Sequence, residues 1–335
     1  MKCSFRLILL LLLVGSTFSC KKSGGPGKTL HSIYITGWAR KGSNWVAMYW
    51  ENGSFKALLD STKNGYTNDI IVYGNDVYIA GSENNGSYLG AKWWKNGIPN
   101  NIASGNSQTV GKSIAVSGND VYVAGVDYTK GSVAMIWKNN IPLRLTNGTN
   151  LAEALSVAVS GNDVYVLGYE IEGSPVKLVA KYWKNGVPTI LSSGSSLTSA
   201  QSIAVQGDDV HVAGYTEING GNYIAKYWKN GKSVDLTDGL TSGFALDIAI
   251  SGEDIYVAGA EDGEAKCWKN GNIIFEGPAS SQARFIAIAG NDVYVAGTVK
   301  NQPAYWRIGD PTPVIIDIKK YGIDLFGITG ISILK

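Results

Sequence analysis

Two short motifs recur in step along this chain of 335 residues, and their regular spacing restricts the fold more than any other feature. The first has the form GNDVYVAG, and its tyrosine position falls at Tyr34, Tyr78, Tyr122, Tyr165, His211, Tyr256 and Tyr294. The second has the form WKNG and follows at Trp50, Trp94, Trp137, Trp183, Trp228, Trp268 and Trp306. Seven copies of one unit predict a repeat architecture in which neighbouring units bury each other's apolar faces.

Each unit is predicted to contain four short β-strands. In residues 200–236, the segments AQSIAVQG, DDVHVAGYT, NYIAKYWKNG and KSVDL combine β-branched and aromatic residues with alternating polarity. The Asn-Gly of WKNG supplies the positive φ angles of a two-residue hairpin turn. A four-stranded sheet that is apolar on both faces needs a neighbour on each side, and a closed ring of sheets, a β-propeller, provides one.

The two ends of the repeat region predict how the ring closes. The region opens at LHSIYITG, which is the second strand of a unit with no first strand before it. The chain ends after IDLFGI (323–328), which we align with the first-strand segment ARFIAI (283–288). The sequence therefore predicts one all-β domain over residues 30–335. This domain is a seven-bladed β-propeller of four-stranded antiparallel blades, and its C-terminal strand pairs in the N-terminal blade.

Residues 1–19 have the features of a bacterial export signal. Lys2 and Arg6 precede an apolar core that is too short for a membrane-spanning helix. Cys20 at its end resembles the acylated first residue of lipoproteins, although Thr17 and Phe18 depart from the usual pattern. The alternative is an ordinary signal peptide. We predict a lipoprotein signal (1–19), a flexible tether from lipidated Cys20 (20–29), and a location in the bacterial cell envelope, with the membrane as a partner.

The repeat pattern resembles that of known bacterial proteins. AVxGNDVYVAG…AKYWKNG is similar to bacterial β-propeller repeat proteins, and its W-x-N-G element resembles repeats of exported bacterial proteins. The resemblance covers about residues 30–335. Because the matching residues belong to turns and core, it implies a propeller lipoprotein and no particular activity.

Charge and reactive residues exclude several classes of function. Once Lys2 and Arg6 leave with the signal, 27 basic residues face 27 acidic ones, so we expect no nucleic-acid partner. The only histidines are His31 and His211, which argues against a catalytic triad or a histidine metal site, and we expect no metal and no cofactor. His211 and Cys267 stand at repeated tyrosine positions and are predicted to be core residues.

Two repeated charged positions are interpreted as structural. The aspartates of GND contribute one carboxylate per blade, which does not converge as a calcium site requires, so we predict that they stabilise turns. The lysines of AKxW are predicted to lay their stems along the third strand with solvated ammonium groups. They are Lys92, Lys181, Lys226 and Lys266.

The connections that vary between units are predicted to lie on one face and to carry the function. Residues leading into the first strands, nearest the axis, are candidates for a pocket lining: Asp69, Lys112, Gln201, Asp247, Arg284 and Asp324. The loops after VAG carry acidic residues in blades two to six: Glu83, Asp127, Glu170, Glu217 and Glu261. In blades seven and one they carry basic residues: Lys300, Arg40 and Lys41. We interpret these charges as a candidate ligand-binding arc, and the alternative is that they are ordinary solvated loop residues. Aromatic residues of these loops can stack on sugars or peptides, or cap the core: Trp38, Tyr66, Tyr88, Tyr128, Tyr169, Tyr215 and Tyr223.

The leading hypothesis is a monomeric, non-catalytic binding or scaffold lipoprotein that holds a glycan, peptide or protein on its variable face. One alternative is a carbohydrate-active hydrolase or lyase that uses Asp69, Asp247 or Asp324, since such enzymes need only a suitably spaced pair of carboxylates. The other is a structural component of an envelope assembly, which predicts an exposed apolar patch on the rim.

Overall fold

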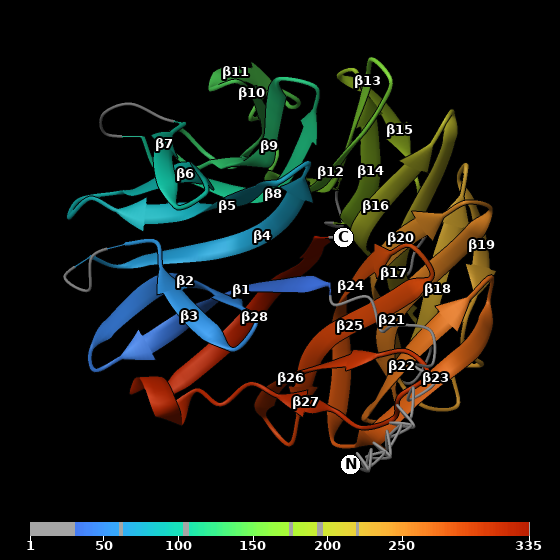
Figure 1. Ribbon diagram of the computed structural model, residues 1–335. Helices are drawn as coiled ribbons and strands as arrows, with labels where there is room; N and C mark the ends of the chain where they lie inside the picture. Colours follow the sequence, from blue (N-terminus) through green and yellow to red (C-terminus); the bar gives the residue numbers. More distant parts are fainter. Residues whose placement is uncertain are drawn as a thin grey trace, which may run out of the picture. The chain divides into compact units, whose positions relative to one another are not determined.

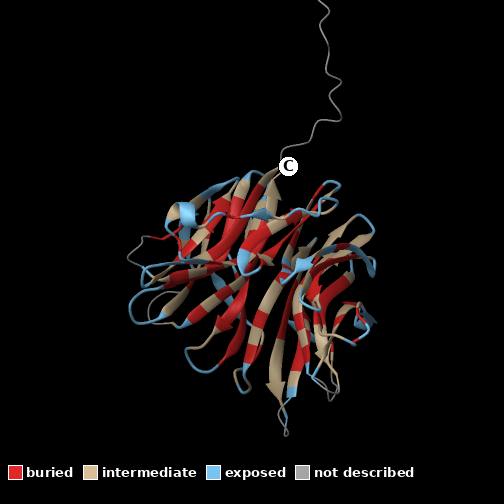
Figure 2. Ribbon diagram, turned by 90° about the horizontal axis from the view of Figure 1, so that it is seen from below, coloured by how far each residue is buried: buried red, intermediate tan, exposed pale blue. Residues whose placement is uncertain are grey.

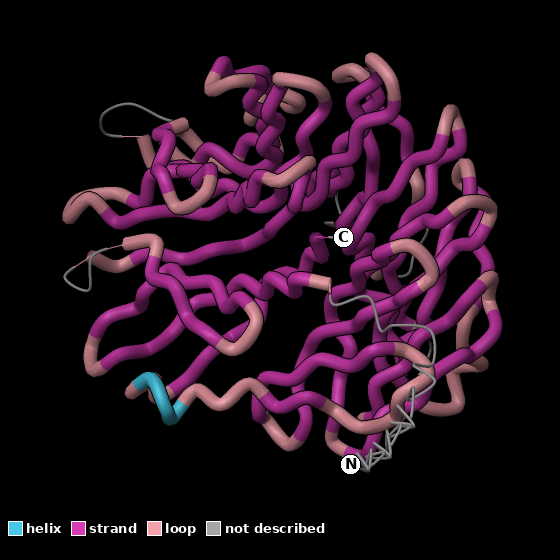
Figure 3. Tube along the Cα trace, viewed as in Figure 1, coloured by secondary structure: helices cyan, strands magenta, loops and turns pink. Residues whose placement is uncertain are grey.

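The computed structural model describes residues 31–59, 63–102, 107–173, 177–192, 197–218 and 221–334. Over these residues the chain forms seven four-stranded antiparallel sheets, arranged as blades about a common axis (Figure 1). Strands make up most of the trace, and the short 3-10 helix η1 (Lys319–Tyr321) precedes the last of them (Figure 3). The predicted seven-bladed propeller is confirmed, whereas the predicted signal and tether lie outside the described residues.

Every blade runs from a strand at the axis to a short edge strand at the rim. The innermost strands of blades 1 to 7 are β28 (Leu325–Leu334), β4 (Gly65–Tyr73), β8 (Thr109–Ser117), β12 (Ala152–Ser160), β16 (Thr198–Gln206), β20 (Gly243–Ser251) and β24 (Ser281–Ala289). The second strands are β1 (Ser32–Lys41), β5 (Asp76–Asn84), β9 (Asp120–Asp127), β13 (Asp163–Glu172), β17 (Asp209–Glu217), β21 (Asp254–Glu261) and β25 (Asp292–Val299). The third strands are β2 (Asn44–Glu51), β6 (Leu89–Lys95), β10 (Val133–Lys138), β14 (Lys177–Lys184), β18 (Tyr223–Lys229), β22 (Glu264–Lys269) and β26 (Gln302–Arg307). The outermost strands are β3 (Ser54–Ala57), β7 (Ile98–Asn101), β11 (Ile141–Arg144), β15 (Val187–Ile190), β19 (Lys232–Asp235), β23 (Asn272–Ala279) and β27 (Val314–Ile315).

The ring closes as predicted, because β28 pairs with β1 in the N-terminal blade (Figure 1). The register, however, differs from our alignment. Ile328 stands opposite Gly37, where Ala283 has the equivalent place in blade 7, so the counterpart of ARFIAI is 328–333 and not 323–328. Apolar residues stand at both odd and even positions of this tail, so its polarity pattern alone does not distinguish one register from another.

The core lies between the blades, and the two motifs supply its two sides. Figure 2 shows buried residues running along the strands of each blade. In blade 2, Trp94 packs against Tyr49 of blade 1, whereas Tyr78 packs against Val123 of blade 3. The tryptophan of each blade thus faces the preceding blade and the tyrosine faces the following one, which explains why both motifs repeat in one phase. His211, at a tyrosine position, is buried as predicted, and burial lowers its pKa.

A β-bulge in each innermost strand explains the repeated glycine of VAG. In blade 3, the pairing of β8 with β9 shifts between Gly111 and Ser113, so Lys112 is an extra residue. The shift brings the Val110 carbonyl so close to Gly125 that a Cβ there would lie 1.9 Å from the oxygen. The equivalent extra residues of blades 1 to 7 are Thr329, Asn68, Lys112, Leu155, Gln201, Leu246 and Arg284.

Candidate functional site

The ring has two unlike faces, which we name after their connections. The turn face carries the tight turns from first to second and from third to fourth strands, such as 74–75 and 96–97 in blade 2. The loop face carries the remaining connections, such as 85–88 between β5 and β6. These connections differ between blades, so a candidate site belongs on the loop face or in the channel that the innermost strands surround.

On the turn face, one network repeats in blades 2 to 6. In blade 2, Asp76 forms an ion pair with Lys95 (2.8 Å) and accepts a hydrogen bond from Asn96 Nδ2 (2.7 Å). Asn96 Oδ1 in turn accepts the Val77 N–H at 2.9 Å. Hydrogen bonds from Lys95 and Asn96 hold the pKa of Asp76 below its usual value. The predicted role of the GND aspartates in turn stabilisation is therefore confirmed. The same ion pair recurs as Asp120–Lys138, Asp163–Lys184, Asp209–Lys229 and Asp254–Lys269, and as Asp292–Arg307 in blade 7.

At the axis, the residue after each bulge joins neighbouring blades. Asp69 Oδ2 accepts hydrogen bonds from Ser113 Oγ (2.8 Å) and from the Ile114 N–H (2.9 Å), both in blade 3. Asp69 Oδ1 accepts a hydrogen bond from the N–H of the next residue, Ile70 (2.7 Å). Ser113 Oγ then accepts the Val157 N–H of blade 4 at 3.2 Å. We call the residues at this position the axial belt: Asp69, Ser113, Ser156, Ser202 and Asp247.

Asp247 connects three blades. Its Oδ1 accepts hydrogen bonds from Ser202 Oγ of blade 5 (2.6 Å) and from the Ile248 N–H (2.9 Å), and its Oδ2 accepts the Ile286 N–H of blade 7 (2.9 Å). Phe285 and Gly330 occupy the belt position in blades 7 and 1. The belt therefore spans blades 2 to 7. Blade 1 is joined to blade 2 by other hydrogen bonds, from the Val72 N–H to Ser332 Oγ (2.9 Å) and from Thr67 Oγ1 to the Gly37 carbonyl (2.8 Å).

The two belt carboxyls titrate well above the usual range for aspartate. Burial raises the pKa of Asp69 and that of Asp247 to about 6, although the hydrogen bonds that they accept oppose the shift. The charge of Asp247 also raises the pKa of Asp69, because a nearby like charge disfavours ionisation. Both oxygens of each carboxylate accept hydrogen bonds, and at least one of them bonds to a neighbouring blade, so neither group is arranged as a free nucleophile or base.

This arrangement predicts that stability increases when the pH falls from 7 to 5. A carboxyl whose pKa is higher in the folded than in the unfolded state binds protons preferentially in the folded state, so the unfolding free energy falls as pH rises from the ordinary pKa of 3.8 to about 6. Each group contributes at most about 3 kcal/mol, and less after screening by solvent in the channel. Urea unfolding at pH 5, 6 and 7 measures the slope. Asp69→Asn should flatten it; an unchanged slope would contradict the assignment.

The structure brings together only part of the candidate pocket lining. Besides the two belt aspartates, Lys112, Gln201 and Arg284 are the extra residues of their bulges. Lys112 Nζ pairs with Glu153 at 2.5 Å, Gln201 donates to a serine of its own strand, and Arg284 is exposed. Asp324 lies apart from all of them.

The place of Asp324 follows from the register of β28. Its Oδ2 accepts the Gly42 N–H at 3.3 Å, at the tip of the β1–β2 hairpin on the loop face. Our alignment set Asp324 at the position of Arg284, but Thr329 occupies that position. Asp324 therefore does not join Asp69 and Asp247 at the channel.

The charged residues predicted on the loop-face hairpins are partly neutralised. Glu83 pairs with Lys63 (2.7 Å) and Lys92, and Glu170 pairs with Lys181 (2.7 Å). Asp127, Glu217 and Glu261 are half-buried, and burial raises the pKa of Glu261. The basic residues Arg40, Lys41 and Lys300 are exposed. The acidic arc is thus interrupted by lysines from the third strands.

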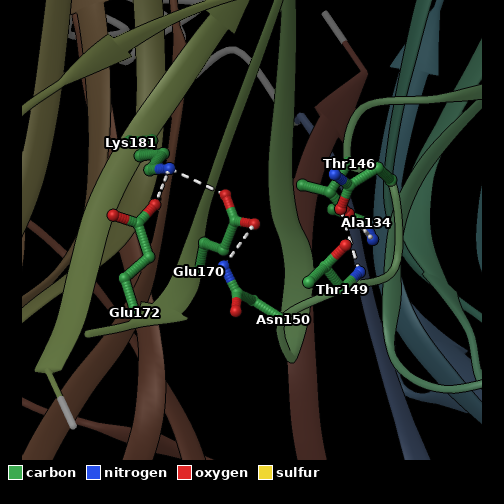
Figure 4. Close-up of polar contacts among 8 residues, drawn as sticks. Ala134, Thr146, Thr149, Asn150, Glu170, Glu172 and Lys181 are labelled. Atoms are coloured by element: carbon green, nitrogen blue, oxygen red, sulfur yellow. Dashed lines mark hydrogen bonds and ion pairs between the residues drawn. The ribbon is translucent and has the colours of Figure 1, made fainter. Parts of the chain in front are cut away.

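The lysines of AKxW are not solvated as predicted, since all four form ion pairs. Lys181 is 8% exposed and lies between Glu170 and Glu172 (Figure 4), and Lys266 lies between Glu276 and Glu264. Each of these lysines stands opposite the glycine of VAG, whose missing side chain leaves room for the lysine against the sheet. A buried ammonium requires such paired carboxylates. Lys92 and Lys226 pair with Glu83 and Asp235.

Two clusters of half-buried aromatic side chains lie on the loop face. In the first, the rings of Trp38 and Trp45 have centroids 5.0 Å apart, and Tyr66 lies 6.4 Å from Trp45. The second consists of Tyr215, Tyr223 and Phe244, with centroids 5.0 to 5.4 Å apart. Both clusters lie where third strands begin, so they border the variable connections.

A third group surrounds Glu153 at the junction of blades 3 and 4. Tyr128 Oη donates to Glu153 Oε1 at 2.5 Å, and Lys112 pairs with the other oxygen. Burial and Glu153 raise the pKa of Tyr169 to about 12. Burial alone would raise the pKa of Glu153, but the hydrogen bonds from Lys112 and Tyr128 outweigh it and lower that pKa. The group is an internally satisfied network.

Sequence reasoning missed several residues of this face and of the channel. Trp45, Phe244, Glu153 and Ser113 were not among the candidates. The belt does have a sequence signal. An Asp or Ser precedes an Ile or Val in the first strands of blades 2 to 6: DIIV, SIAV, SVAV, SIAV and DIAI.

No protein-family model and no curated protein sequence matches the chain. Solved structures are similar in fold. A puromycin-hydrolysing peptidase of Mycobacterium tuberculosis is 12% identical, with a TM-score of 0.54, over 75% of this chain and 46% of that one. A prolyl endopeptidase is 11% identical, with a TM-score of 0.52, over 85% of this chain and 49% of that one. TolB from Acinetobacter baumannii is 10% identical, with a TM-score of 0.50, over 90% of this chain and 66% of that one. These likenesses show the fold alone.

The chain therefore spans about half the length of either peptidase. Among the described residues, no three His, Cys, Asp or Glu side chains are grouped as metal ligands. The same part of the chain contains no helix of the length and apolarity needed to cross a bilayer.

Proposed function

We propose that this protein is a lipid-anchored binding protein of the bacterial envelope that holds its ligand on the loop face. The contrast between the two faces carries the proposal. The turn face repeats one Asp–Lys–Asn network from blade to blade, whereas the loop face carries different aromatic and charged groups in each blade. Residues that differ between repeats are those that can select a particular molecule.

The position of the chain ends supports this assignment. The first described residue, His31, contacts Asp292 on the turn face at 3.1 Å, and Ser32 pairs with Leu334 at the same end of blade 1. The described part of the chain therefore begins on the turn face, opposite the face to which we assign the ligand.

Binding is favoured over the hydrolase or lyase alternative by the chemistry of the channel. Asp69 and Asp247 each accept three hydrogen bonds, two of which link neighbouring blades, and this accounts for their burial and their place in the repeat. Asp324 lies away from them at a hairpin tip. The similarity to peptidases covers less than half of those chains and transfers no active site.

A structural role in an envelope assembly is the second candidate, and the rim favours it. The outermost strands β7, β11 and β15 expose Ile98, Ile141 and Val187, of which Ile141 is 72% exposed. An apolar pocket of about 240 Å³ between blades 3 and 4 includes Leu143 and Val164. Prolines in the same strands limit pairing with another sheet edge, so a partner would contact side chains and not the backbone.

Site-specific photo-crosslinking in cells distinguishes the two candidates. Benzoylphenylalanine replaces Lys41 on the loop face, Ile141 on the rim or Asp208 on the turn face, all of which are exposed. We expect an adduct from position 41 and none from position 208. Adducts only from position 141 would replace the binding role with the assembly role, and adducts only from position 208 would contradict both.

A further inference from the structure

A polar pocket adjoins the first aromatic cluster on the loop face. It has a volume of about 540 Å³ and is lined by Lys63, Asn64, Glu83, Asn84, Asn85 and Gly86. Its volume is within the range of small-molecule sites, about 300 to 1,000 Å³. The lining residues flank β4 and β5 of blade 2, at the ends of these strands that face the loop side.

One residue joins this pocket to the aromatic rings. Asn64 Oδ1 accepts the backbone N–H of Trp45 at 2.8 Å, and the Asn64 carbonyl accepts the Asn84 N–H at 2.8 Å. Tyr66 follows Asn64 by two residues, so both side chains are on the same side of the strand. Asn64 thus lines the pocket and also bonds to the backbone of the aromatic cluster, which places the two side by side at the junction of blades 1 and 2.

The two charged residues that line the pocket, Lys63 and Glu83, have opposite charges. Burial would raise the pKa of Glu83, but hydrogen bonds from Lys63 and Lys92 outweigh it and lower that pKa, so the group is ionised at neutral pH. Its carboxylate is 8% exposed and is paired with both lysines. Lys92 is not part of the lining, so the lining itself has one cation and one anion and favours neither an anionic nor a cationic ligand.

The remaining polar groups are amides held in place by the hairpin. Asn84 Oδ1 accepts the Gly86 N–H at 2.8 Å, and Asn85 Oδ1 accepts the Tyr88 N–H at 2.9 Å. The side-chain oxygens are thus turned toward the backbone. The NH₂ groups of Asn84 and Asn85 are the donors left for the oxygen atoms of a ligand.

The aromatic rings are held in fixed positions. Trp38 packs on β28 where Gly327 leaves room, since a Cβ on that glycine would lie 2.4 Å from the indole. Trp45 contacts Trp38 edge to face at 79°, and Tyr66 is tilted by 34° to Trp45. Aromatic surfaces that do not have to be ordered on binding lose little conformational entropy.

Fixed aromatic faces beside neutral amides suit a sugar ring, which has an apolar C–H face and a rim of hydroxyl groups. We propose that the loop face of blades 1 and 2 binds a neutral oligosaccharide. One sugar ring stacks on Trp45 and Tyr66, and its hydroxyl groups accept hydrogen bonds from the side-chain amides of Asn84 and Asn85. This assignment rests on the proposed binding function and names its ligand class.

Calorimetric titration of the full chain in a sugar-free detergent tests the assignment. The probes are neutral hexasaccharides: cellohexaose, xylohexaose, maltohexaose and laminarihexaose. We expect at least one to bind, and Trp45→Ala to weaken it by about tenfold or more, as for other aromatic anchors. Asn84→Ala, a variant of an exposed side chain, should weaken the same sugar several-fold without a change in melting temperature.

The matched control is Tyr223→Ala in the second aromatic cluster, which should leave sugar affinity unchanged. Loss of affinity in Tyr223→Ala, with full affinity in Trp45→Ala, would place the sugar elsewhere and overturn this site. If none of the four sugars binds while position 41 still crosslinks to a protein or peptide, the sugar assignment fails and the binding function stands. If no sugar binds and position 41 gives no adduct, both fail.

Discussion

Removal of β28 should abolish cooperative folding of the ring. A chain that ends at Gly322 lacks the strand that pairs with β1 and fills the space between blades 7 and 2. It also lacks Phe326, Ile328 and Ile331, which are buried in the cluster that blades 1 and 7 share. Loss of each such side chain costs about 2 to 5 kcal/mol, and the sum is comparable with the whole stability of a domain, about 5 to 15 kcal/mol. Thermal unfolding followed by circular dichroism should show no sigmoidal transition.

Two point variants test whether the buried side chains of β28 stabilise the ring, or whether any substitution in this strand lowers stability. Ile331→Ala, at a buried position, should lower the unfolding free energy by about 2 to 4 kcal/mol. Leu325→Ala, at an exposed position of the same strand, should lower it by less than about 1 kcal/mol. A truncated chain that melts cooperatively near the wild-type temperature would contradict the account of closure.

The architecture could be predicted because each blade contributes one motif residue to the core on each of its two faces, and both motifs are visible in the sequence. A tryptophan that must reach the preceding blade and a tyrosine that must reach the following one leave a signal in each repeat. The unpaired second strand at the start of the domain likewise required a first strand from elsewhere in the chain. Closure was therefore predictable from the number and order of the elements.

The register of β28 and the surroundings of the AKxW lysines were not predictable in the same way. Alternation determines which face a residue belongs to, but a bulge in each innermost strand changes the alignment by one residue, and nothing in the alternation marks it. The tail also has apolar residues at both odd and even positions, so the pattern allowed an alignment that was wrong by five residues, and it set Asp324 at the place that Thr329 occupies. The burial of Lys181 depends on Glu170 and Glu172 of the adjacent strand, which sequence spacing does not pair with it.

For the candidate site too, some residues could be predicted from the sequence and others could not. Charged hairpin residues could be assigned to one face from connection lengths alone. The contact of Trp45 with Asn64 and Tyr66 crosses from blade 1 to blade 2, and the belt joins residues more than 40 positions apart, such as Asp69 and Ser113. Contacts between repeats depend on how the blades are rotated against each other, which a single repeat does not encode.

Asp247→Ala should destabilise the protein strongly, because three blades meet at this one carboxylate. Without it, Ser202 Oγ and the N–H groups of Ile248 and Ile286 lose their acceptor at the junction of blades 5, 6 and 7. Each unsatisfied buried donor costs about 1 to 3 kcal/mol, so the unfolding free energy at pH 7 should fall by about 3 to 6 kcal/mol. Urea unfolding followed by tryptophan fluorescence measures the change.

Asp247→Asn separates the hydrogen bonds of this residue from its charge. The amide keeps one acceptor oxygen and removes a charge that burial makes unfavourable above a pKa of about 6, so its loss of stability at pH 7 should be smaller than that of Asp247→Ala. Asp208→Ala on the turn face is the control: its carboxylate is exposed, and its removal should change stability by less than about 0.5 kcal/mol. If Asp247→Ala is no more destabilising than this control, the belt does not hold the blades together. The axial carboxylates would then need another explanation, and the catalytic alternative would regain its main candidates.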